Sequence, residues 1–163
     1  MATPARIEPR PAPIVLAPDG GLRLESGPGR DLTFKVTGEE TAGAFDYSIV
    51  DVAPHGGPPL HVHHIHAEAI HALEGRYKIR IGEETFTCEE GGFAYMPAGL
   101  PHAFLNLTGA LGRVVLLYAP GGAHRFFEEY GPLARDGVTD RAVLAGVFER
   151  HDMTLLGPPL TAD

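Results

Sequence analysis

Histidines are concentrated in one short segment of this chain. Six of the nine histidines lie in it: His55, His61, His63, His64, His66 and His71. His61 and His63 are separated by one residue, so on a β-strand their side chains point to the same face. Two imidazoles on one face can bind a single metal ion. We interpret His61 and His63 as candidate metal ligands and expect His64 to face the other way.

A histidine outside such a pair is more often a surface residue or a hydrogen-bonded core residue. We assign this role to three histidines without a motif: His55, His124 and His151. His66 and His71 could each be a hydrogen-bond partner of the site or a pocket residue. A structural role is favoured for both, since strand alternation sends Ile70 and Ala72 inward and His71 outward.

The segments that must position these residues have the pattern of β-strands. Apolar and polar residues alternate over residues 32–37, 45–52 and 76–81, as in half-buried strands. Gly82 and Glu83 form the expected turn into a strand over residues 85–88, and further apolar runs occupy residues 92–96 and 114–118. The 21 glycines and 15 prolines favour many tight turns between short strands. This pattern predicts an all-β sandwich or barrel.

The pattern changes after Pro120. Residues 125–130 predict one or two helical turns, and four apolar residues share one face of a second helix: Val143, Leu144, Val147 and Phe148. Thr139 is the expected N-cap of that helix, and the charge of Asp140 favours its positive end. Two prolines in the closing segment, residues 157–160, cannot continue a helix. We expect the helix to end before them.

Length and composition exclude several functional classes. A chain of 163 residues suits one domain, and it has no second copy of the histidine-rich segment. No apolar run approaches the roughly 20 residues that cross a bilayer. A net charge of −8 disfavours nucleic acid. Polar residues and prolines interrupt any signal peptide near residue 10, and the single cysteine, Cys88, is consistent with a cytoplasmic protein.

These features divide the chain into three parts. We predict an N-terminal extension with early strands over residues 1–30 and a barrel over residues 31–120. Residues 121–163 are predicted to form a helical segment packed on that barrel.

Two motifs resemble those of the cupin superfamily. The first runs from Pro59-Leu60-His61-Val62-His63 through Glu68 to Gly75. The second runs from Gly91 through Pro97-Ala98-Gly99-Leu100-Pro101-His102 to Asn106. One departure is His55, which stands where the first motif usually begins with glycine. The resemblance implies a single cupin barrel of the double-stranded β-helix, or jelly-roll, type.

The resemblance also implies one metal site inside the barrel, with four ligands: His61, His63, Glu68 and His102. Three imidazoles and a carboxylate leave positions open on a five- or six-coordinate ion, as a catalytic site requires. Such ligands suit Fe, Mn, Ni, Co, Cu or Zn, and the sequence does not select among them. Pro97 and Gly99 are expected to shape the turn before His102. Phe104 should share the face of His102 and is a candidate wall of the substrate pocket.

A finer resemblance is to short bacterial quercetin 2,3-dioxygenase-like cupins, in residues 59–64 and 155–160. His66, Ala67 and His71 depart from that pattern. The resemblance implies a dioxygenase acting on a flavonol-like or other enolisable aromatic substrate, with Glu68 as both ligand and catalytic base. A metal-dependent isomerase or lyase acting on a sugar or keto acid, and a non-catalytic small-molecule-binding cupin, are the alternatives. We expect a homodimer that pairs through strands between residues 13 and 26.

Overall fold

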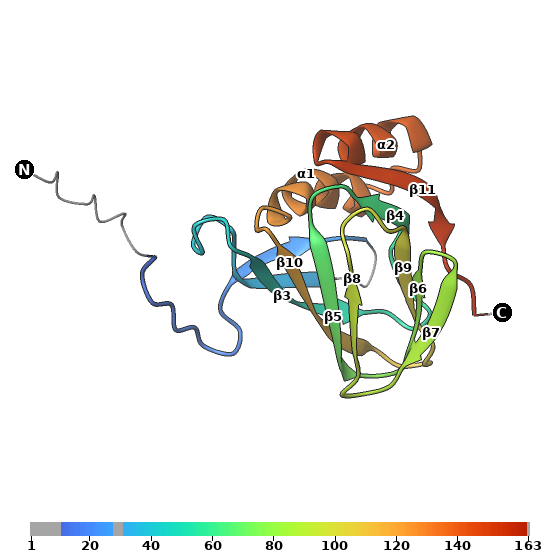
Figure 1. The fold of residues 1–163 in the computed structure, drawn as a ribbon, viewed down its shortest axis with the longest axis horizontal. Helices are drawn as coiled ribbons and strands as arrows, with labels where there is room; N and C mark the ends of the chain where they lie inside the picture. Colours follow the sequence, from blue (N-terminus) through green and yellow to red (C-terminus); the bar gives the residue numbers. More distant parts are fainter. Residues whose placement is uncertain (1–10, 28–30, 163) are drawn as a thin grey trace, which may run out of the picture.

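The computed structural model describes residues 11–27 and 31–162, which form two antiparallel β-sheets and two short helices. The first sheet has the order β1 (Leu22–Glu25), β2 (Asp31–Val36), β3 (Asp46–Val52), β10 (Gly112–Ala119), β5 (Ala67–Glu74) and β8 (Phe93–Met96). The second has the order β11 (Met153–Pro159), β4 (Pro59–His63), β9 (His102–Asn106), β6 (Tyr77–Ile81) and β7 (Glu84–Cys88). Figure 1 shows the barrel that these strands build. The prediction of an all-β jelly-roll is confirmed.

The core lies between the two sheets and follows the alternation of the strands. On β5, Ile70 and Ala72 are fully buried whereas His71 between them is exposed, as predicted. The hairpin of β6 and β7 pairs Tyr77 with Cys88 and Ile81 with Glu84 across the expected turn. Burying alternate apolar residues from both sheets holds them together, at about 25 cal/mol for each Å² of apolar surface removed from water.

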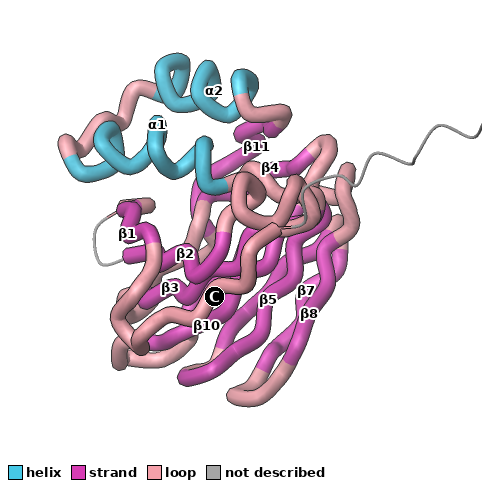
Figure 2. The backbone as a smooth tube through the Cα atoms, turned by 90° about the vertical axis from the view of Figure 1, so that its left-hand side faces the viewer, coloured by secondary structure: helices cyan, strands magenta, loops and turns pink. Residues whose placement is uncertain are grey.

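Two helices cover one end of the barrel: α1 (His124–Arg135) and α2 (Arg141–Arg150) (Figure 2). The first is longer than the sequence predicts, since it continues to Arg135 with Gly131 buried and Leu133 packed against the core. The predicted N-cap of the second helix, Thr139, is wrong by one residue. Asp140 is the cap, and its side chain accepts hydrogen bonds from the backbone N–H groups at the start of α2.

Strand β11 is not predicted by the sequence, because Gly157 and the two prolines after it are poor strand formers. It nevertheless pairs antiparallel with β4, joining Met153 to His63 and Leu155 to His61. The register shifts between Leu155 and Pro159, where the prolines have no N–H to donate. The chain thus returns from the helices to the sheet that carries the paired histidines.

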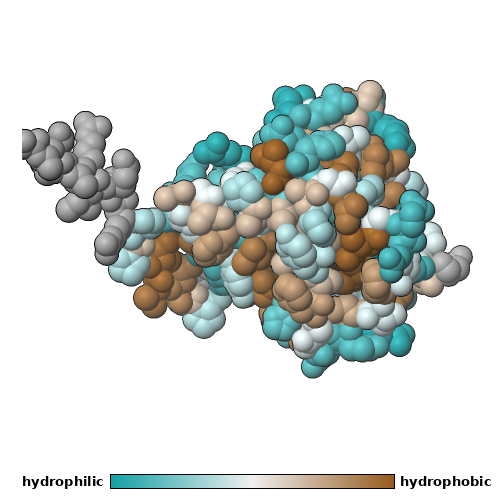
Figure 3. Space-filling view, viewed as in Figure 1, coloured by the Kyte–Doolittle hydropathy of each residue, from teal (hydrophilic) through white to brown (hydrophobic). Residues whose placement is uncertain are grey.

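Of the early strands expected between residues 13 and 26, the structure contains β1 only. Residues 11–17 are extended, and a turn at Ala17–Gly20 leads into β1 (Figure 1). Lys35 on β2 donates hydrogen bonds to the carbonyl oxygens of Pro18 and Gly20. Three apolar side chains on this segment are exposed: Ile14, Val15 and Leu16. Figure 3 shows apolar surface there. The homodimer stays a prediction.

Candidate metal centre

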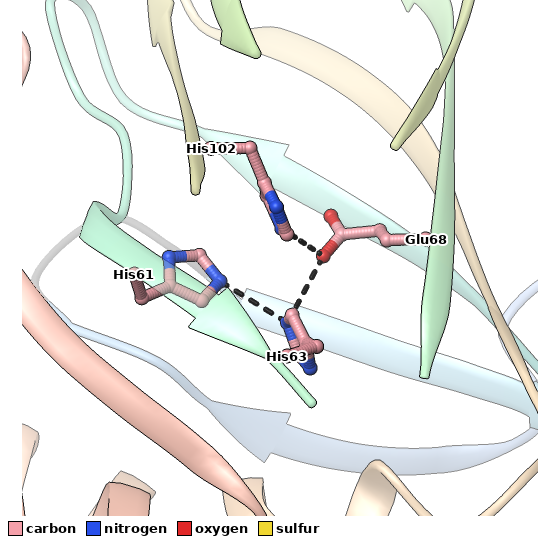
Figure 4. A group of neighbouring side chains, drawn as sticks. All are labelled: His61, His63, Glu68 and His102. Carbon is pink, nitrogen blue, oxygen red and sulfur yellow. Dashed lines mark hydrogen bonds and ion pairs between the residues drawn. The ribbon is translucent and has the colours of Figure 1, made fainter. Parts of the chain in front are cut away.

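Four side chains from both sheets point toward one another inside the barrel (Figure 4). His61 and His63 project from the same face of β4, Glu68 from β5 and His102 from β9. His102 lies beside His61 in the register of β4 and β9. All four residues are at most 7% exposed, and one possible ligand atom from each lies within 4.8 Å of the others. The structure thus brings together the four residues named by the cupin resemblance, in a cluster that could hold a metal ion.

The contacts within the cluster join its potential ligand atoms. His61 Nε2 lies 3.1 Å from His63 Nε2. Glu68 Oε2 lies 3.3 Å from the Nε2 atoms of both His63 and His102. These atoms are therefore gathered around one point rather than paired with separate partners.

Hydrogen bonds at the far side of two rings fix which nitrogen faces that point. Nδ1 of His61 lies 2.8 Å from the Pro59 carbonyl oxygen, and Nδ1 of His102 lies 2.8 Å from that of Leu100. A carbonyl oxygen only accepts hydrogen bonds, so both Nδ1 atoms carry a proton, and in the neutral ring each Nε2 presents a lone pair. Lone pairs and a carboxylate that converge in a buried site need a cation between them. This donor set fits one divalent transition metal.

His63 is held differently. Among the described residues, its Nδ1 is the buried side-chain nitrogen or oxygen that lacks a hydrogen-bond partner. The ring of His63 stacks on that of His102 at 5.3 Å and lies 5.8 Å from the ring of Tyr118. Its position therefore depends on ring packing and on the cluster itself, with no carbonyl to orient it.

Burial and the contacts within the cluster together determine the protonation states of its side chains. Loss of solvation, with the charges of His102 and His63 in support, lowers the pKa of His61 to about 3. Burial likewise lowers the pKa of His63, against the opposing effect of Glu68. Burial alone would raise the pKa of Glu68, but hydrogen bonds from His102 and His63 outweigh it and lower that pKa. Neutral imidazoles and an ionised carboxylate are the forms that bind a metal.

The pKa of His102 moves the other way. Burial would lower it, but the hydrogen bond and the charge of Glu68 outweigh burial and raise it. Without a metal, His102 is thus the histidine of the cluster that holds a proton most readily, beside the carboxylate that needs a counter-charge.

The cluster opens on a cavity of about 40 Å³, which we name the inner cavity. Its walls include six aromatic side chains: Phe104, Tyr118, Phe126, Phe127, Tyr130 and Phe148. Glu68 is the only acidic residue in the lining described by the structure, and no lysine or arginine takes part. Phe104, the predicted pocket wall, lies in this lining. The cavity therefore offers an apolar, aromatic environment next to the four candidate ligands.

A second cavity of about 270 Å³, which we name the outer cavity, lies beside the first. Four residues line both cavities: His63, Phe126, Phe127 and Met153. The outer cavity adds five polar or charged residues: His66, Arg125, Arg150, His151 and Asp152. Sequence reasoning missed the arginines, because they lie 25 positions apart on different helices and belong to no motif.

The remaining histidines have other partners or face solvent. His64 is exposed, and its Nε2 lies 2.8 Å from Thr154 Oγ1. His66 is buried, and its Nδ1 donates to the Pro120 carbonyl oxygen at 2.7 Å. His124 and His151 contact carboxylates, those of Asp46 and Glu129. Hydrogen bonding thus accounts for His124 and His151, as predicted.

The departure at His55 has a local explanation. His55 has a φ of 55°, in the left-handed region that glycine adopts at low cost. Two residues on, a Cβ at Gly57 would overlap the carbonyl oxygen of Phe104. The loop before β4 thus keeps the close approach to β9, although the position that usually carries glycine has a side chain.

The comparisons with known proteins agree with this geometry. Residues 48–125 match the family model described as Cupin domain. No curated protein matches the chain significantly. The chain resembles the structure of an RmlC-like cupin from Shewanella frigidimarina, with a TM-score of 0.60, 10% identity, and coverage of 70% of this chain and 96% of that one.

Two further structures have the same fold. A sugar phosphate isomerase of the cupin superfamily from Silicibacter pomeroyi has a TM-score of 0.55 and 21% identity, covering 65% of this chain and 75% of that one. A predicted oxalate decarboxylase from Thermotoga maritima has a TM-score of 0.58 and 13% identity, covering 66% and 98%. The chain thus contains a segment that matches the Cupin domain model and shares the fold of these cupin structures. None of the helices in residues 11–27 and 31–162 is long and apolar enough to span a membrane.

Proposed function

We propose that this protein is a metal-dependent oxygenase whose substrate is an enolisable aromatic compound. The observation that carries the proposal is the setting of the four candidate ligands, which open on a cavity with aromatic walls. Aromatic walls favour a flat ring, because stacked and edge-to-face contacts add to the burial of apolar surface. A sugar would place most of its hydroxyl groups against apolar side chains there, where they lose hydrogen bonds to water.

A bound transition metal would supply a Lewis acid for a substrate oxygen and a redox centre for dioxygen. The chain would supply the proton transfer. Glu68 is ionised and buried, so its carboxylate can accept the proton of an enol hydroxyl in the inner cavity. The aromatic side chains of α1 and α2 would orient the ring and keep water away from the electron-rich enolate.

The size of the inner cavity bears on the substrate. Pockets for drug-sized ligands span roughly 300–1,000 Å³, far above the 40 Å³ of the inner cavity. A flavonol-like substrate therefore requires the aromatic side chains of α1 and α2 to move, whereas a one-ring phenol requires a smaller displacement. The finer resemblance to quercetin 2,3-dioxygenase-like proteins supports the reaction class rather than the size of the substrate.

A second candidate is a metal-dependent isomerase or lyase acting on a keto acid. The observation in its favour is the pair of arginines in the outer cavity, which could bind a carboxylate. This reaction would use the same four ligands without oxygen.

The test is oxygen consumption by metal-loaded protein with a panel of phenols and enols, under matched aerobic and anaerobic conditions. We expect turnover with one oxygen molecule consumed for each substrate molecule. Glu68→Gln should abolish turnover in samples that still bind metal, because the amide cannot take up the enol proton. Glu74→Gln is the matched control, since this exposed carboxylate ends the same strand. Equal turnover without oxygen would contradict the oxygenase and favour the isomerase or lyase.

A further inference from the structure

The outer cavity adjoins the metal centre but has a different chemical character. It lies where the start of α1, the end of α2 and the start of β11 meet. His63 contributes to its lining, so a ligand in the outer cavity reaches the edge of the candidate metal cluster. The side chains that line the outer cavity determine which chemical group it can bind.

Its two guanidinium groups retain hydrogen-bonding capacity. Arg125 donates through Nη2 to Glu39 at 3.0 Å, and Arg150 donates through Nε and Nη2 to Glu129. A guanidinium group has five N–H donors, so most of those on Arg125 and several on Arg150 stay available for a ligand. Each arginine keeps an acidic neighbour, so an anion would be held by directed hydrogen bonds more than by net charge.

His66 adds an acceptor to the same cavity. Its Nδ1 donates to the Pro120 carbonyl oxygen, so in the neutral ring its Nε2 has a lone pair. The residue is 7% exposed and lines the outer cavity. Donors from arginine and an acceptor from histidine together suit a group that carries both an anionic oxygen and a hydroxyl or bound water.

The backbone at the start of α1 does not provide the anion site. The buried carboxylate of Asp46 already accepts hydrogen bonds from the N–H groups of Gly122 and His124, at 2.8 Å and 3.2 Å. These bonds fix the Gly121–Gly122 wall of the outer cavity. Among the described residues of this lining, Arg125 and Arg150 carry the positive charge that an anion needs, beside one carboxylate, that of Asp152.

The sizes of the two cavities point to one ligand that spans both. The outer cavity, at about 270 Å³, is just below the range for drug-sized ligands, and the inner cavity is far below it. Phe126, Phe127 and Met153 line both, so rotation of these side chains would join the two spaces. The joined cavity would be apolar at the metal and polar at the opposite end.

We propose that the outer cavity binds the carboxylate of an aromatic acid, with Arg125 and Arg150 as specificity-determining residues. The aromatic ring of the same molecule occupies the inner cavity, next to Glu68. This inference rests on the proposed function, which places the aromatic ring of the substrate in the inner cavity. It adds that the substrate also carries a carboxylate.

The experiment compares two probes that differ in this group: 4-hydroxybenzoate and 4-hydroxybenzyl alcohol. Their dissociation constants are measured by calorimetry on the full chain as purified, with metal content determined for each variant. We expect wild type to bind the acid about tenfold more tightly, since a hydrogen bond to a charged group contributes on the order of a tenfold change in affinity. Arg125→Gln should reduce this preference, and Arg125→Gln with Arg150→Gln should remove it.

Arg135→Gln is the matched control, because Arg135 also lies on α1 in a surface ion pair but lines neither cavity. It should keep the wild-type preference. Equal affinity of the two probes for wild type would overturn the proposal, and so would a preference that survives in the double variant, because the carboxylate would then bind elsewhere. Binding is measured apart from oxygen consumption, so failure of the oxygenase and failure of the carboxylate site give different results.

Discussion

The inner and outer cavities share a wall but are built from different kinds of structure. The ligands of the inner cavity come from strands β4, β5 and β9, whose positions are fixed by hydrogen bonds across both sheets. The polar groups of the outer cavity come largely from helix ends and the segments that connect them. Strands of a scaffold hold a reactive site more rigidly, whereas connecting segments vary more freely. The fold thus builds the candidate metal centre on strands and the adjoining polar cavity largely on helix ends and connecting segments.

The two cavities also differ in the charged side chains that line them. Glu68 is the ionised group of the inner cavity, and its pKa is lowered by two histidines. The arginines of the outer cavity are about 60% exposed and pair with exposed carboxylates. Removing a buried partner should therefore cost far more than removing an exposed one.

The largest effect is expected from a change to a ligand of the inner cavity. His102→Ala removes one of four candidate ligand atoms. We expect the metal affinity to fall by more than about 100-fold, because losing a ligand weakens binding more than losing a residue that is hydrogen-bonded to a ligand. Elemental analysis of protein dialysed against a fixed metal concentration measures this. His64→Ala is the control, because His64 is exposed beside the site and contacts Thr154 instead. Similar metal loss in both variants would contradict the assignment.

A change in the aromatic wall tests the inner cavity without replacing a candidate ligand. Phe148 is 3% exposed and packs against Phe126 and the ring of His61. Phe148→Ala should lower the free energy of unfolding by about 3–5 kcal/mol, because it leaves a hole in a packed core. Urea unfolding measures this loss. Val143→Ala, an exposed position on the same helix, should change stability by less than about 0.5 kcal/mol.

The Phe148→Ala variant also bears on substrate size. If the ring occupies the inner cavity, the variant should keep its metal and accept bulkier phenols than wild type. An unchanged preference among phenols of different size would place the aromatic ring outside the inner cavity.

Acid should weaken the metal-free protein through the buried histidines. Below pH 6.5 the unfolded chain protonates His61 and His63, whereas the lowered pKa values keep both neutral in the folded chain. For His61, stability should fall by about 1.4 kcal/mol per pH unit as pH decreases from 6.5 toward 3, and His63 adds a loss in the same direction. The raised pKa of His102 acts above pH 6.5, where it stabilises the folded chain as pH decreases.

Urea unfolding of chelator-treated protein at pH 7, 6 and 5 measures this dependence. His61→Gln should reduce the slope, and His64→Gln should leave it unchanged. Stability that rises between pH 6 and pH 5 would contradict the burial of neutral histidines in the cluster.

Local patterns were sufficient to predict part of the candidate metal centre and one wall residue of the inner cavity, Phe104. Alternation along a strand places His61 and His63 on one face and His71 on the outside, since each side chain follows its own backbone. The meeting of His63, Glu68 and His102 could not come from alternation, because they lie on three strands. The motif resemblance supplied that set of residues.

The outer cavity and its surroundings were harder to predict because they depend on tertiary packing. β11 forms in a segment with two prolines because β4 offers a partner edge, which no local propensity reveals. Arg125 and Arg150 approach the same space only once α1 and α2 are docked. Asp140 caps α2 in place of Thr139, a shift of one residue that is decided by the geometry of the side chain.

The most direct test of the account is the position of the metal. Crystals of the metal-loaded protein can be measured at the absorption edge of that metal, where anomalous scattering locates the ion. We predict one ion per chain, about 2.0–2.2 Å from a nitrogen of His61, His63 and His102 and from an oxygen of Glu68. An ion bound elsewhere, or an empty cluster in crystals that contain metal, would contradict the account.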